Sequence, residues 1–377
     1  MSFRRFRAIA RKEFLHILRD PRSLAMSLAL PVVMMALFGY ALTLDVDRIP
    51  LALFDQDRTP DSRELASRFS GSRFFDLTTT VDSYAEAEAL IDRGTCLAVL
   101  TIPTDYGADL HRGRTPTVQL LLDGTDSNTA SIALGYATGI VGDWSQRVRE
   151  RTLNHELGRT FEAPLQLRPR IWYNTTLESR NYIVPGLIAV ILMIIAALLT
   201  SLTIAREWEM GTMEQLLSTP VRPLELVLGK MSAYFALGVV DTLLAVVLGV
   251  AVFGVPLRGN LVLLAISCFV FLAGALCWGI FLSAMVRSQL LAYQLGMISS
   301  FLPAFLLSGF VFAIENMPLP VQISTYVIPA RYFVTILKGI FLKGVGVPVI
   351  GTEILLLTVF AIVVAMAATW RVKGKIA

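Results

Sequence analysis

The sequence has 377 residues, of which 55% are hydrophobic and only 16% are charged, and its mean hydropathy is +0.63. Soluble domains carry about 25% charged residues, so this composition excludes a soluble protein of this length and indicates an integral membrane protein. The net charge of +4 gives no reason to expect a nucleic-acid partner, because the basic residues stand at the ends of apolar segments, where membrane topology explains them.

Residues 1–22 form the first predicted element, a basic amphipathic helix. Hydrophobic residues recur at helical spacing from Phe3 to Leu18, and six basic residues stand between them or beside them from Arg4 to Arg19. Such a helix suits a membrane surface, where its cationic face meets anionic headgroups. A signal peptide is the alternative, but the apolar run that follows is longer than the ~7–15 residues usual for one, so we expect the segment to be retained.

Six segments are apolar and long enough to cross a bilayer, whose hydrocarbon core takes about 20 helical residues. We predict membrane spans at 23–44, 181–205, 231–257, 261–286, 288–314 and 351–371, followed by a tail at 372–377. Pro318, Pro320 and Pro329 interrupt the segment 315–350, which predicts a re-entrant or interfacial helical pair on the outer side. The predicted fold class is therefore an α-helical integral membrane protein with six transmembrane helices.

Residues 45–180, between the first two spans, differ from the rest because they are polar. Strand-like runs alternate with helical patterns, and the runs lie at 49–54, 74–80, 96–102 and 117–123. A long helix is predicted to follow from about Ser127 to Leu157. Strands that alternate with helices predict one large α/β domain with a largely parallel or mixed sheet, inserted between the first and second spans.

Few residues suggest a catalytic or metal-binding site. Four aspartates at strand ends could bind a cation, although turn formation is the more common cause of aspartate there: Asp55, Asp57, Asp123 and Asp126. The histidines have no metal-ligand spacing, and they are His16, His111 and His155. We expect the three cysteines to be packing residues, and they are Cys96, Cys268 and Cys277. We therefore predict neither a catalytic nor a metal site.

The basic residues also predict the orientation. Short segments on the side of the N-terminus hold 14 Lys and Arg residues, whereas those on the other side hold four: Arg258, Arg331, Lys338 and Lys343. Because cytoplasmic loops carry an excess of Lys and Arg, we place both termini and the loop 206–230 in the cytoplasm. The α/β domain then lies outside, and the protein is expected in the cell (inner) membrane as a multi-pass protein.

The loop 206–230, REWEMGTMEQLLSTPVRPLELVLGK, is too polar to enter lipid and too patterned to be a linker. Met213, Leu216 and Leu217 fall on one face of a short predicted helix, which acidic residues precede. Such a helix suits either a groove on a cytoplasmic protein or the lipid interface. Its acidic residues favour the protein groove, because the inner leaflet is itself anionic.

This loop resembles the signature of ABC-2 type permeases, the membrane subunits of ATP-binding-cassette exporters. In that family Glu, Gly-Thr, Glu-Gln-Leu-Leu and Thr-Pro occupy these relative positions. KEFLHILRDP (12–21) resembles the family's N-terminal connecting helix, and LSGFVFAIENMP (307–318) with IPARYFVTILKGIFLKG (328–344) resembles its outer segment before the last span. The resemblance covers nearly the whole chain and points to permeases of bacterial multidrug exporters.

The resemblance implies roles for two groups of residues. The stretch from Glu207 to Leu217 would be the coupling helix that docks on a nucleotide-binding subunit, and its residues would be Glu207, Glu209, Gly211, Thr212, Glu214 and Leu217. Residues 4–19 would be the connecting helix that braces the same subunit, with Arg11, Lys12, Glu13 and Arg19.

The resemblance also implies partners. They would be an ABC ATPase subunit, a second permease copy or homologue, membrane lipid and a periplasmic adaptor protein. The sequence contains no G-x-x-x-x-G-K-[ST] phosphate loop, so we expect this chain to be no enzyme and to hold no cofactor, with ATP and Mg bound by the partner subunit.

Asp241 is the one charge deep inside a predicted span, and intramembrane carboxylates are candidates for function. Met297, Phe301, Phe305 and Phe310 could line a transport path, although such stripes more often serve helix packing. The leading prediction is a permease that exports an amphipathic molecule. The alternatives are a membrane-anchored receptor or scaffold with an external ligand-binding domain, and an ion-coupled secondary transporter that uses Asp241.

Overall fold

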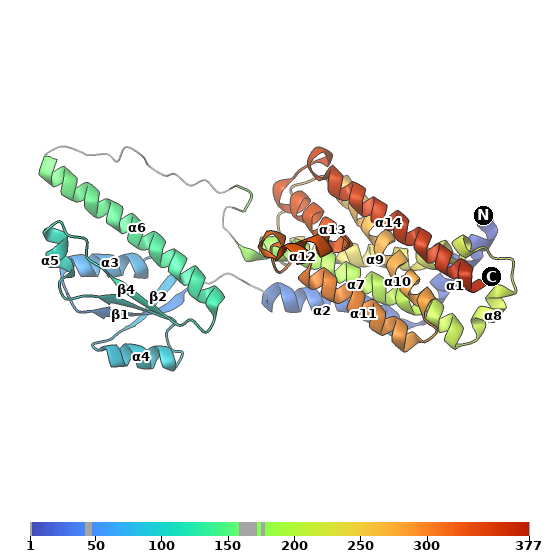
Figure 1. Ribbon diagram of the computed structural model, residues 1–377, viewed down its shortest axis with the longest axis horizontal. Helices are drawn as coiled ribbons and strands as arrows, with labels where there is room; N and C mark the ends of the chain where they lie inside the picture. The colour runs from blue at the N-terminus through green and yellow to red at the C-terminus, as the bar shows by residue number, and fades with distance from the viewer. Residues whose placement is uncertain (1, 42–46, 158–171, 175–177, 377) are drawn as a thin grey trace. The chain divides into compact units, whose positions relative to one another are not determined.

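The chain folds into two units, shown in Figure 1. The computed structural model describes residues 2–41, 47–157, 172–174 and 178–376. One unit, Leu44–Arg170, has an α/β fold, and the other, which contains Met1–Thr43 and Ile171–Ala377, is helical.

The α/β unit is built on a four-stranded sheet with the strand order β2-β1-β3-β4. β1 (Ile49–Asp55) lies parallel to β2 (Phe75–Thr80) and to β3 (Ala98–Ile102), whereas β4 (Gln119–Leu122) pairs antiparallel with β3. The strands agree with the predicted segments to within two residues at each end, and the prediction of a mixed sheet is confirmed.

Helices cover both faces of this sheet, and they are α3 (Pro60–Ser70), α4 (Tyr84–Asp92), α5 (Tyr106–His111) and α6 (Ser127–Leu157). Successive residues of a strand face opposite sides. Leu51 of β1 accordingly shares a core with Leu65 of α3 and Trp144 of α6. Its neighbour Ala52 shares a second core with Ala87 of α4.

The helical unit consists mainly of long helices. They are α1 (Phe3–Arg19), α2 (Pro21–Ala41), α7 (Ser179–Glu209), α9 (Pro223–Ala251), α10 (Leu261–Met285), α11 (Gln289–Leu306) and α14 (Val347–Ile376). α7 extends beyond the predicted span 181–205 at both ends. α9 begins earlier than the predicted span 231–257, so that its first turns occupy the end of the predicted loop 206–230, and it ends at Ala251, before the predicted end.

Five helices are long and apolar enough to span a membrane: α7, α9, α10, α11 and α14. A bent pair of helices described below would make a sixth if it is one span. The first predicted span, 23–44, forms most of α2, whose described apolar stretch is Ser27–Ala41, and residues 42–44 lie outside the described part. The protein is thus a helical membrane protein with five to six candidate spans, and the set of six predicted from the sequence stays a prediction.

α7 is the central helix of this unit. Its residues from Ile183 to Ala197 are almost all buried, because α2, α9, α10, α11 and α13 pack around it. Small residues allow this close packing. A Cβ on Gly279 of α10 would lie 2.5 Å from the Ala197 carbonyl oxygen of α7, and a Cβ on Gly296 of α11 would lie 2.9 Å from Ser201 Oγ.

The predicted fifth span, 288–314, is too long. α11 ends at Leu306, and the chain then turns through Gly309, whose φ is +79°. The carbonyl oxygen of Gly309 accepts hydrogen bonds from Tyr182 Oη at 3.0 Å and Lys338 Nζ at 2.8 Å. Two partners therefore hold this carbonyl outside any helix, which explains why the apolar run does not continue as one.

A bent helical pair follows, as predicted for residues 315–350. A single turn, η1 (Ile314–Asn316), leads to α12 (Leu319–Thr325) and then to α13 (Pro329–Lys338), which continues into the π-helical turn η2 (Gly339–Lys343). The two helices are bent by 84°, the geometry of a re-entrant loop or a broken span. The side of the membrane on which they lie stays a prediction.

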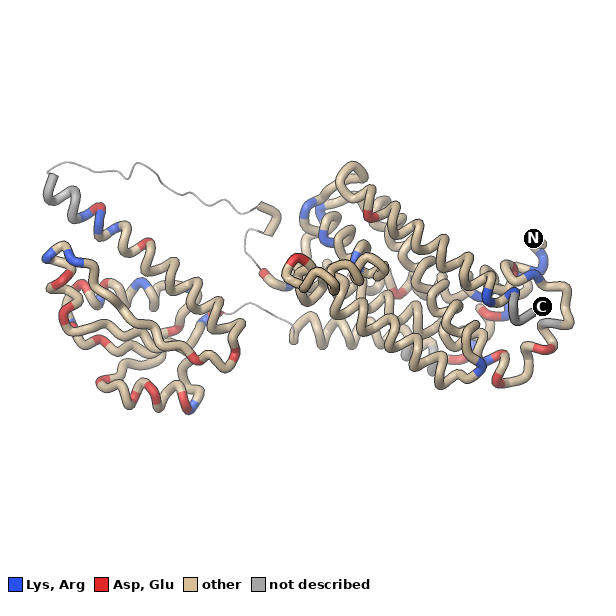
Figure 2. The backbone as a smooth tube through the Cα atoms, in the orientation of Figure 1, with Lys and Arg blue, Asp and Glu red and all other residues tan. Residues whose placement is uncertain are grey.

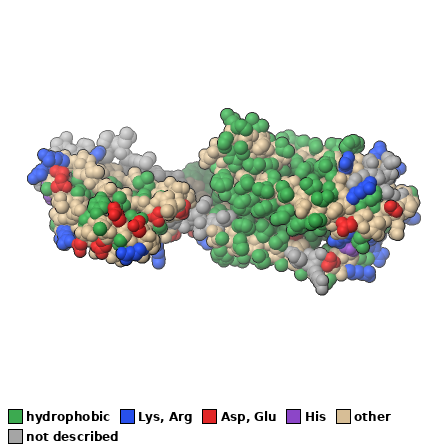
Figure 3. All heavy atoms as spheres, turned by 60° about the horizontal axis from the view of Figure 1, so that its bottom comes forward, with side chains coloured by type: hydrophobic (Ala, Val, Ile, Leu, Met, Phe, Trp, Pro, Cys, Tyr) green, Lys and Arg blue, Asp and Glu red, His purple; other side chains and the backbone are tan. Residues whose placement is uncertain are grey.

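Charged residues of the helical unit gather near the two ends of its helices (Figure 2). Between these ends, Figure 3 shows a wide hydrophobic surface. Leu243 of α9, Leu290 of α11 and Leu355 of α14 are more than 60% exposed, as expected for side chains that face lipid or another membrane helix. Both chain termini lie at the same end, together with α1 and α8 (Figure 1).

Gly279→Ala is expected to destabilise the protein by about 2 kcal/mol, because the Ala197 carbonyl cannot move away without bending α7. The measurement is the thermal midpoint of the purified protein in detergent. Gly351→Ala is the matched control, since its Cβ would meet only Val347 Cγ1 at 3.8 Å. Equal midpoints for the two variants would contradict the close approach of α10 to α7.

Candidate functional site

Four helices meet at the end of the helical unit that carries both termini (Figure 1): α1, the last turns of α7, the short α8 (Thr212–Leu217) and the first turns of α9. α1 lies directly on α9, since a Cβ at Gly229 would come within 2.7 Å of Ile9 Cγ2. A residue larger than glycine would push α1 away, so Gly229 determines where α1 crosses α9.

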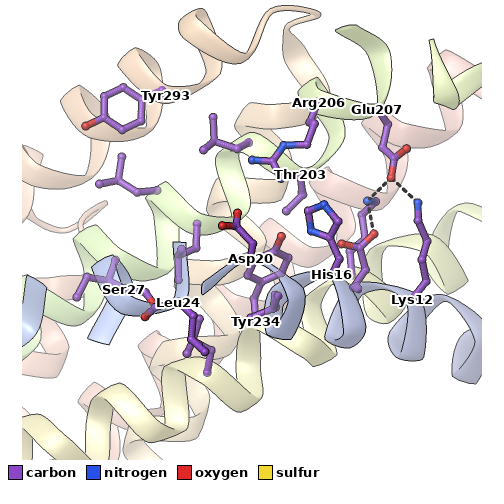
Figure 4. Close-up of a pocket in the computed structure, with 18 of the residues that line it drawn as sticks. Lys12, His16, Asp20, Leu24, Ser27, Thr203, Arg206, Glu207, Tyr234 and Tyr293 are labelled. Atoms are coloured by element: carbon purple, nitrogen blue, oxygen red, sulfur yellow. Dashed lines mark hydrogen bonds and ion pairs between the residues drawn. The ribbon is translucent and has the colours of Figure 1, made fainter. Parts of the chain in front are cut away.

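Two lysines and two glutamates form an ion cluster at this junction, and all of them except Lys12 are buried (Figure 4). Lys230 of α9 donates from Nζ to Glu13 Oε1 of α1 at 2.7 Å and to Glu207 Oε1 of α7 at 3.1 Å. Lys12 of α1 donates to the same oxygen of Glu207 at 2.8 Å. Lys230 is 1% exposed, Glu13 5% and Glu207 8%. These four residues are called the ion cluster below.

The charges of the ion cluster balance, two positive and two negative, but the side chain of Lys12 is 54% exposed. The three buried members alone carry one net negative charge, which the exposed Lys12 neutralises from the surface. Removing one partner of a buried ion pair typically costs ~3–5 kcal/mol, because the other charge is left without water and without a partner. Lys230 serves both glutamates, so one ammonium group joins α1, α7 and α9.

The chain turns between α7 and α8 at Met210 and Gly211. Gly211 has a φ of +70°, a conformation that residues with a Cβ rarely adopt. Thr212, the first residue of α8, donates its hydroxyl to Glu207 Oε2 and so ties α8 to the ion cluster. The stretch from Glu207 to Leu217 is therefore not one helix, because the left-handed turn at Gly211 ends α7 at Glu209 and separates it from α8. The short helix predicted after the acidic residues is confirmed as α8, and its role in docking stays a prediction.

The apolar face of α8 packs into the protein's own core. Met213 is 1% exposed and lies in one cluster with Leu216, Ile9 of α1 and Val372 of α14. The side chain of Leu217 lies outside the described part of the chain. The interpretation of this face as a stripe for a partner's groove is thus corrected, since helices of the same chain already bury it.

α8 and the turn before it leave a mostly polar surface exposed, called the turn surface here: Glu209, Met210, Gly211, Glu214 and Gln215. Met210 is 68% exposed and is its one large apolar side chain. Glu209 Oε2 accepts the backbone N–H of Gln289 at 2.7 Å, which fixes the turn surface to the start of α11.

Two residues at the junction were not assigned from the sequence. They are Lys230 and Glu225, whose Oε2 accepts the backbone N–H of Arg222 at 3.1 Å and whose Oε1 accepts that of Ser2 at 2.5 Å. The sequence held a signal for Lys230, because it directly precedes a long apolar run and Glu13 is one of only two acids in the predicted basic helix. The other predicted connecting-helix residues, Arg11, Lys12 and Arg19, are all exposed, and Lys12 also joins the ion cluster.

None of the predicted path residues lines the cavity described in the next paragraph. Asp241 is fully buried in α9, and neither carboxylate oxygen has a hydrogen-bond partner among the described residues. Met297 of α11 is 43% exposed, whereas Phe301 and Phe305 contact each other with ring centroids 5.5 Å apart. Phe305 also contacts the buried Phe310, so these rings serve the packing of α11.

A cavity of about 420 Å³ lies beside the ion cluster, between α1, α2, α7, α9 and α11 (Figure 4). Its polar end holds Lys12, Glu13, His16, Asp20, Arg206, Glu207 and Lys230. Its apolar walls include Leu24, Leu30, Ile195, Leu198, Leu199 and Leu202. The cavity is thus charged at one end and apolar along its length.

The aspartates at the strand ends form turns. Asp55 Oδ1 accepts the backbone N–H groups of Asp57 at 3.1 Å and Arg58 at 3.0 Å. Hydrogen bonds from Thr125 lower the pKa of Asp123 from its ordinary value. Among the described residues, no group of three or more His, Cys, Asp or Glu side chains could hold a metal ion. All three cysteines are buried and free, in agreement with their interpretation as packing residues.

The chain resembles known proteins along nearly its whole length. The family model described as ABC-2 family transporter protein matches residues 21–370. YbhS of Escherichia coli, named a probable multidrug ABC transporter permease, is 35% identical over 371 residues, which are 98% of this chain and 97% of that protein. YbhR of the same organism, named likewise, is 30% identical over 374 residues, 99% of this chain and 100% of that protein. The inner membrane transport permease YhhJ is 28% identical over 315 residues, 82% and 80% of the two chains.

Lys230→Met is expected to lower the free energy of unfolding by about 3–5 kcal/mol, because it leaves the buried Glu13 without a lysine and the buried Glu207 with only the exposed Lys12. Lys343→Met, at an exposed lysine, is the matched control. Adding Glu13→Gln to Lys230→Met should recover part of the loss, which thermal unfolding measures as a coupling energy. The ion cluster is disproved if the two lysine variants unfold at the same temperature.

Asp241→Asn is expected to leave the thermal midpoint unchanged or to raise it. The carboxylate has no partner among the described residues, and an amide is less costly to bury than a charge. Thermal unfolding in detergent measures the effect. A fall of several degrees would instead mean that the carboxylate is held by a partner.

Proposed function

This chain belongs to the ABC-2 family of transporter proteins, and we propose that it is the permease subunit through which an ABC exporter moves an amphipathic molecule out of the cell. It is a multi-pass protein of the inner membrane, and its family associates with an ABC ATP-binding subunit. The observation that carries the proposal is the junction of α1, α7, α8 and α9, where an exposed turn surface is hydrogen-bonded to the ion cluster through Thr212.

The turn surface is the proposed contact with the ATPase subunit. It presents one exposed apolar side chain, Met210, among polar groups that include Glu214 and Gln215. Binding surfaces often combine one apolar anchor with a polar rim, because the anchor supplies most of the free energy and the rim supplies specificity. Glu207 acts in this proposal as a positioning residue, since its carboxylate is occupied by Lys12, Lys230 and Thr212.

The ion cluster is the proposed route by which motion of the ATPase reaches the membrane. A push on α8 acts on Glu207 at the end of α7 through Thr212, and on α9 and α1 through Lys230. α7 is the helix around which the unit packs, so a shift of its end moves the helices that contact it. Rigid-body shifts of packed helices are a common way to change access to a site.

The proposed orientation in the membrane rests on the basic residues at the end that carries α1 and α8. α1, α8 and both termini lie together, and this end carries most of the basic residues of the short segments. The positive-inside rule places it in the cytoplasm, where ATP is available to a partner. The α/β unit Leu44–Arg170 would then lie outside, where a periplasmic adaptor protein could contact it. Export rather than import rests on the names of the relatives.

The remaining partners are a second permease copy or homologue and membrane lipid. Val240, Leu243 and Val247 lie one turn apart on α9 and are each at least 50% exposed, so they need an apolar neighbour. ATP and Mg would bind to the ATPase subunit, and this chain would be neither an enzyme nor a holder of cofactors.

An ion-coupled transporter is the second candidate, and the buried Asp241 without a hydrogen-bond partner in the described part is the observation that favours it. Purified chain in proton- or sodium-loaded vesicles would then transport without ATP, and Asp241→Asn would abolish that transport. ATP-dependent transport that survives Asp241→Asn would exclude this candidate.

The proposed contact is tested by co-purification of the chain with the candidate ATPase. The double variant Met210→Asp with Glu214→Lys is expected to weaken binding at least about ten-fold and to abolish substrate-stimulated ATPase activity, while the thermal midpoint stays close to wild type because both side chains are exposed.

Asp92→Lys is the control, since it reverses an exposed charge in the α/β unit on a residue that is not part of the turn surface. It should leave both binding and ATPase activity unchanged. Binding that tolerates the double variant as well as the control would place the ATPase contact elsewhere on the chain.

A further inference from the structure

The cavity beside the ion cluster has the form of a site for an amphipathic small molecule. Its volume of about 420 Å³ lies in the range of ~300–1,000 Å³ that small-molecule sites occupy. Leucines of α2 and α7 form its walls, and charged side chains of α1, α7 and α9 form one end. A purely polar or a purely apolar ligand would leave one of these two parts without a partner.

The acids at the charged end are already engaged. Glu13 and Glu207 accept hydrogen bonds from the lysines of the ion cluster at 2.7–3.1 Å. Asp20, the third acid that lines this end, has a partner as well. These carboxylates therefore offer little attraction to a cationic headgroup.

Two basic side chains at the same end have hydrogen-bond donors that no described residue accepts. Arg206 is half-buried and donates its Nε–H to Gln289 Oε1 at 3.3 Å, whereas its terminal amino groups have no hydrogen-bond partner among the described residues. The ring of His16 likewise has no hydrogen bond or ion pair with a described residue. Figure 4 shows both side chains at the same end of the cavity, Arg206 from α7 and His16 from α1. A guanidinium with free amino groups is well suited to bind a carboxylate or a phosphate through two hydrogen bonds.

We propose that this cavity binds a single-chain amphiphile with an anionic headgroup, such as a long-chain carboxylate or an alkyl phosphate. The headgroup lies at Arg206 and His16, level with the surface helix α1. The chain runs along Leu198, Leu199 and Leu202 of α7 into the apolar part of the unit.

The cavity is open to such a molecule from the side. Leu30 of α2 and Tyr293 of α11 both line it and are 38% and 42% exposed, so the cavity reaches the surface where these helices face outward. A ring contact between Phe38 and Phe305, with centroids 5.9 Å apart, joins the same two helices farther along. An amphiphile in the adjoining leaflet would meet the opening with its headgroup already at the level of Arg206.

Headgroup preference is the first test. The chain, in nanodiscs of neutral phosphatidylcholine, is labelled with a photoreactive C16 carboxylate, and the labelled peptides are identified by mass spectrometry. Competitors with the same C16 chain are hexadecyl phosphate, hexadecylphosphocholine and hexadecyltrimethylammonium. We expect labels on α1, α2 and α7, and displacement by hexadecyl phosphate at a concentration at least about ten-fold lower than by the trimethylammonium compound. Equal displacement by all three headgroups, or labels confined to other helices, would overturn the proposal.

Two pairs of variants then separate the headgroup from the chain. Arg206→Gln should weaken labelling about ten-fold, whereas Arg371→Gln, at an exposed arginine, should not. Leu198→Trp should weaken labelling, because the larger side chain fills the cavity. Leu243→Trp should not, because the side chain of Leu243 is 64% exposed and does not line the cavity. Equal effects within either pair would contradict the site, and thermal midpoints establish that each variant is folded. If Arg206→Gln does not fold, the headgroup series on the wild-type chain decides.

The bound amphiphile is either a lipid that stays in the cavity or a substrate that is transported across the membrane. Inside-out vesicles that contain the chain and its ATPase distinguish these sources. Movement of the C16 carboxylate that requires ATP identifies cargo, and binding without movement identifies a resident lipid. Either result supports the site, and only this last measurement rests on the function proposed above.

Discussion

One ammonium group, that of Lys230, organises the end of the molecule on which the proposed function depends. It lies where water does not reach, so its charge has to be balanced by carboxylates of the same chain. Those carboxylates come from α1 and α7, which are nearly 200 residues apart in sequence. The cost of an unpaired buried charge therefore holds three helices in one arrangement, and α8 is attached to it through Thr212.

The rest of the helical unit has to meet a second requirement. Its outer surface is apolar, and its helices must nevertheless pack closely against one another. Small residues allow this close packing where helices cross. Gly279 and Gly296 let α10 and α11 approach the backbone of α7, and Gly229 does the same for α1 on α9. Charges are confined to the helix ends, with Asp241 as the exception. The cavity lies where the charged end of the helices adjoins their apolar part, so its lining is charged at one end and apolar along its walls.

Most elements could be predicted from the sequence because their signals are local. The strands of the α/β unit and its long helix α6 follow from hydrophobic periodicity and turn residues, and the structure agrees with them closely. The end of α11 could not be predicted in this way. Its apolar run continues to residue 314, but Tyr182 and Lys338, which are distant in sequence, hold the carbonyl of Gly309 outside a helix.

The sequence by itself determined that this is a membrane protein with an inserted α/β unit, and its motif in the loop 206–230 was sufficient to indicate the family. Only the tertiary structure decided which residues of that motif are accessible. Met213 and Leu216 form an apolar stripe whether they face a partner or the chain itself, and Glu207 is acidic whether it is exposed or paired. Burial depends on the neighbours that a side chain acquires on folding. Those neighbours, Ile9, Val372 and Lys230, come from other parts of the chain, and no local pattern specifies that they meet.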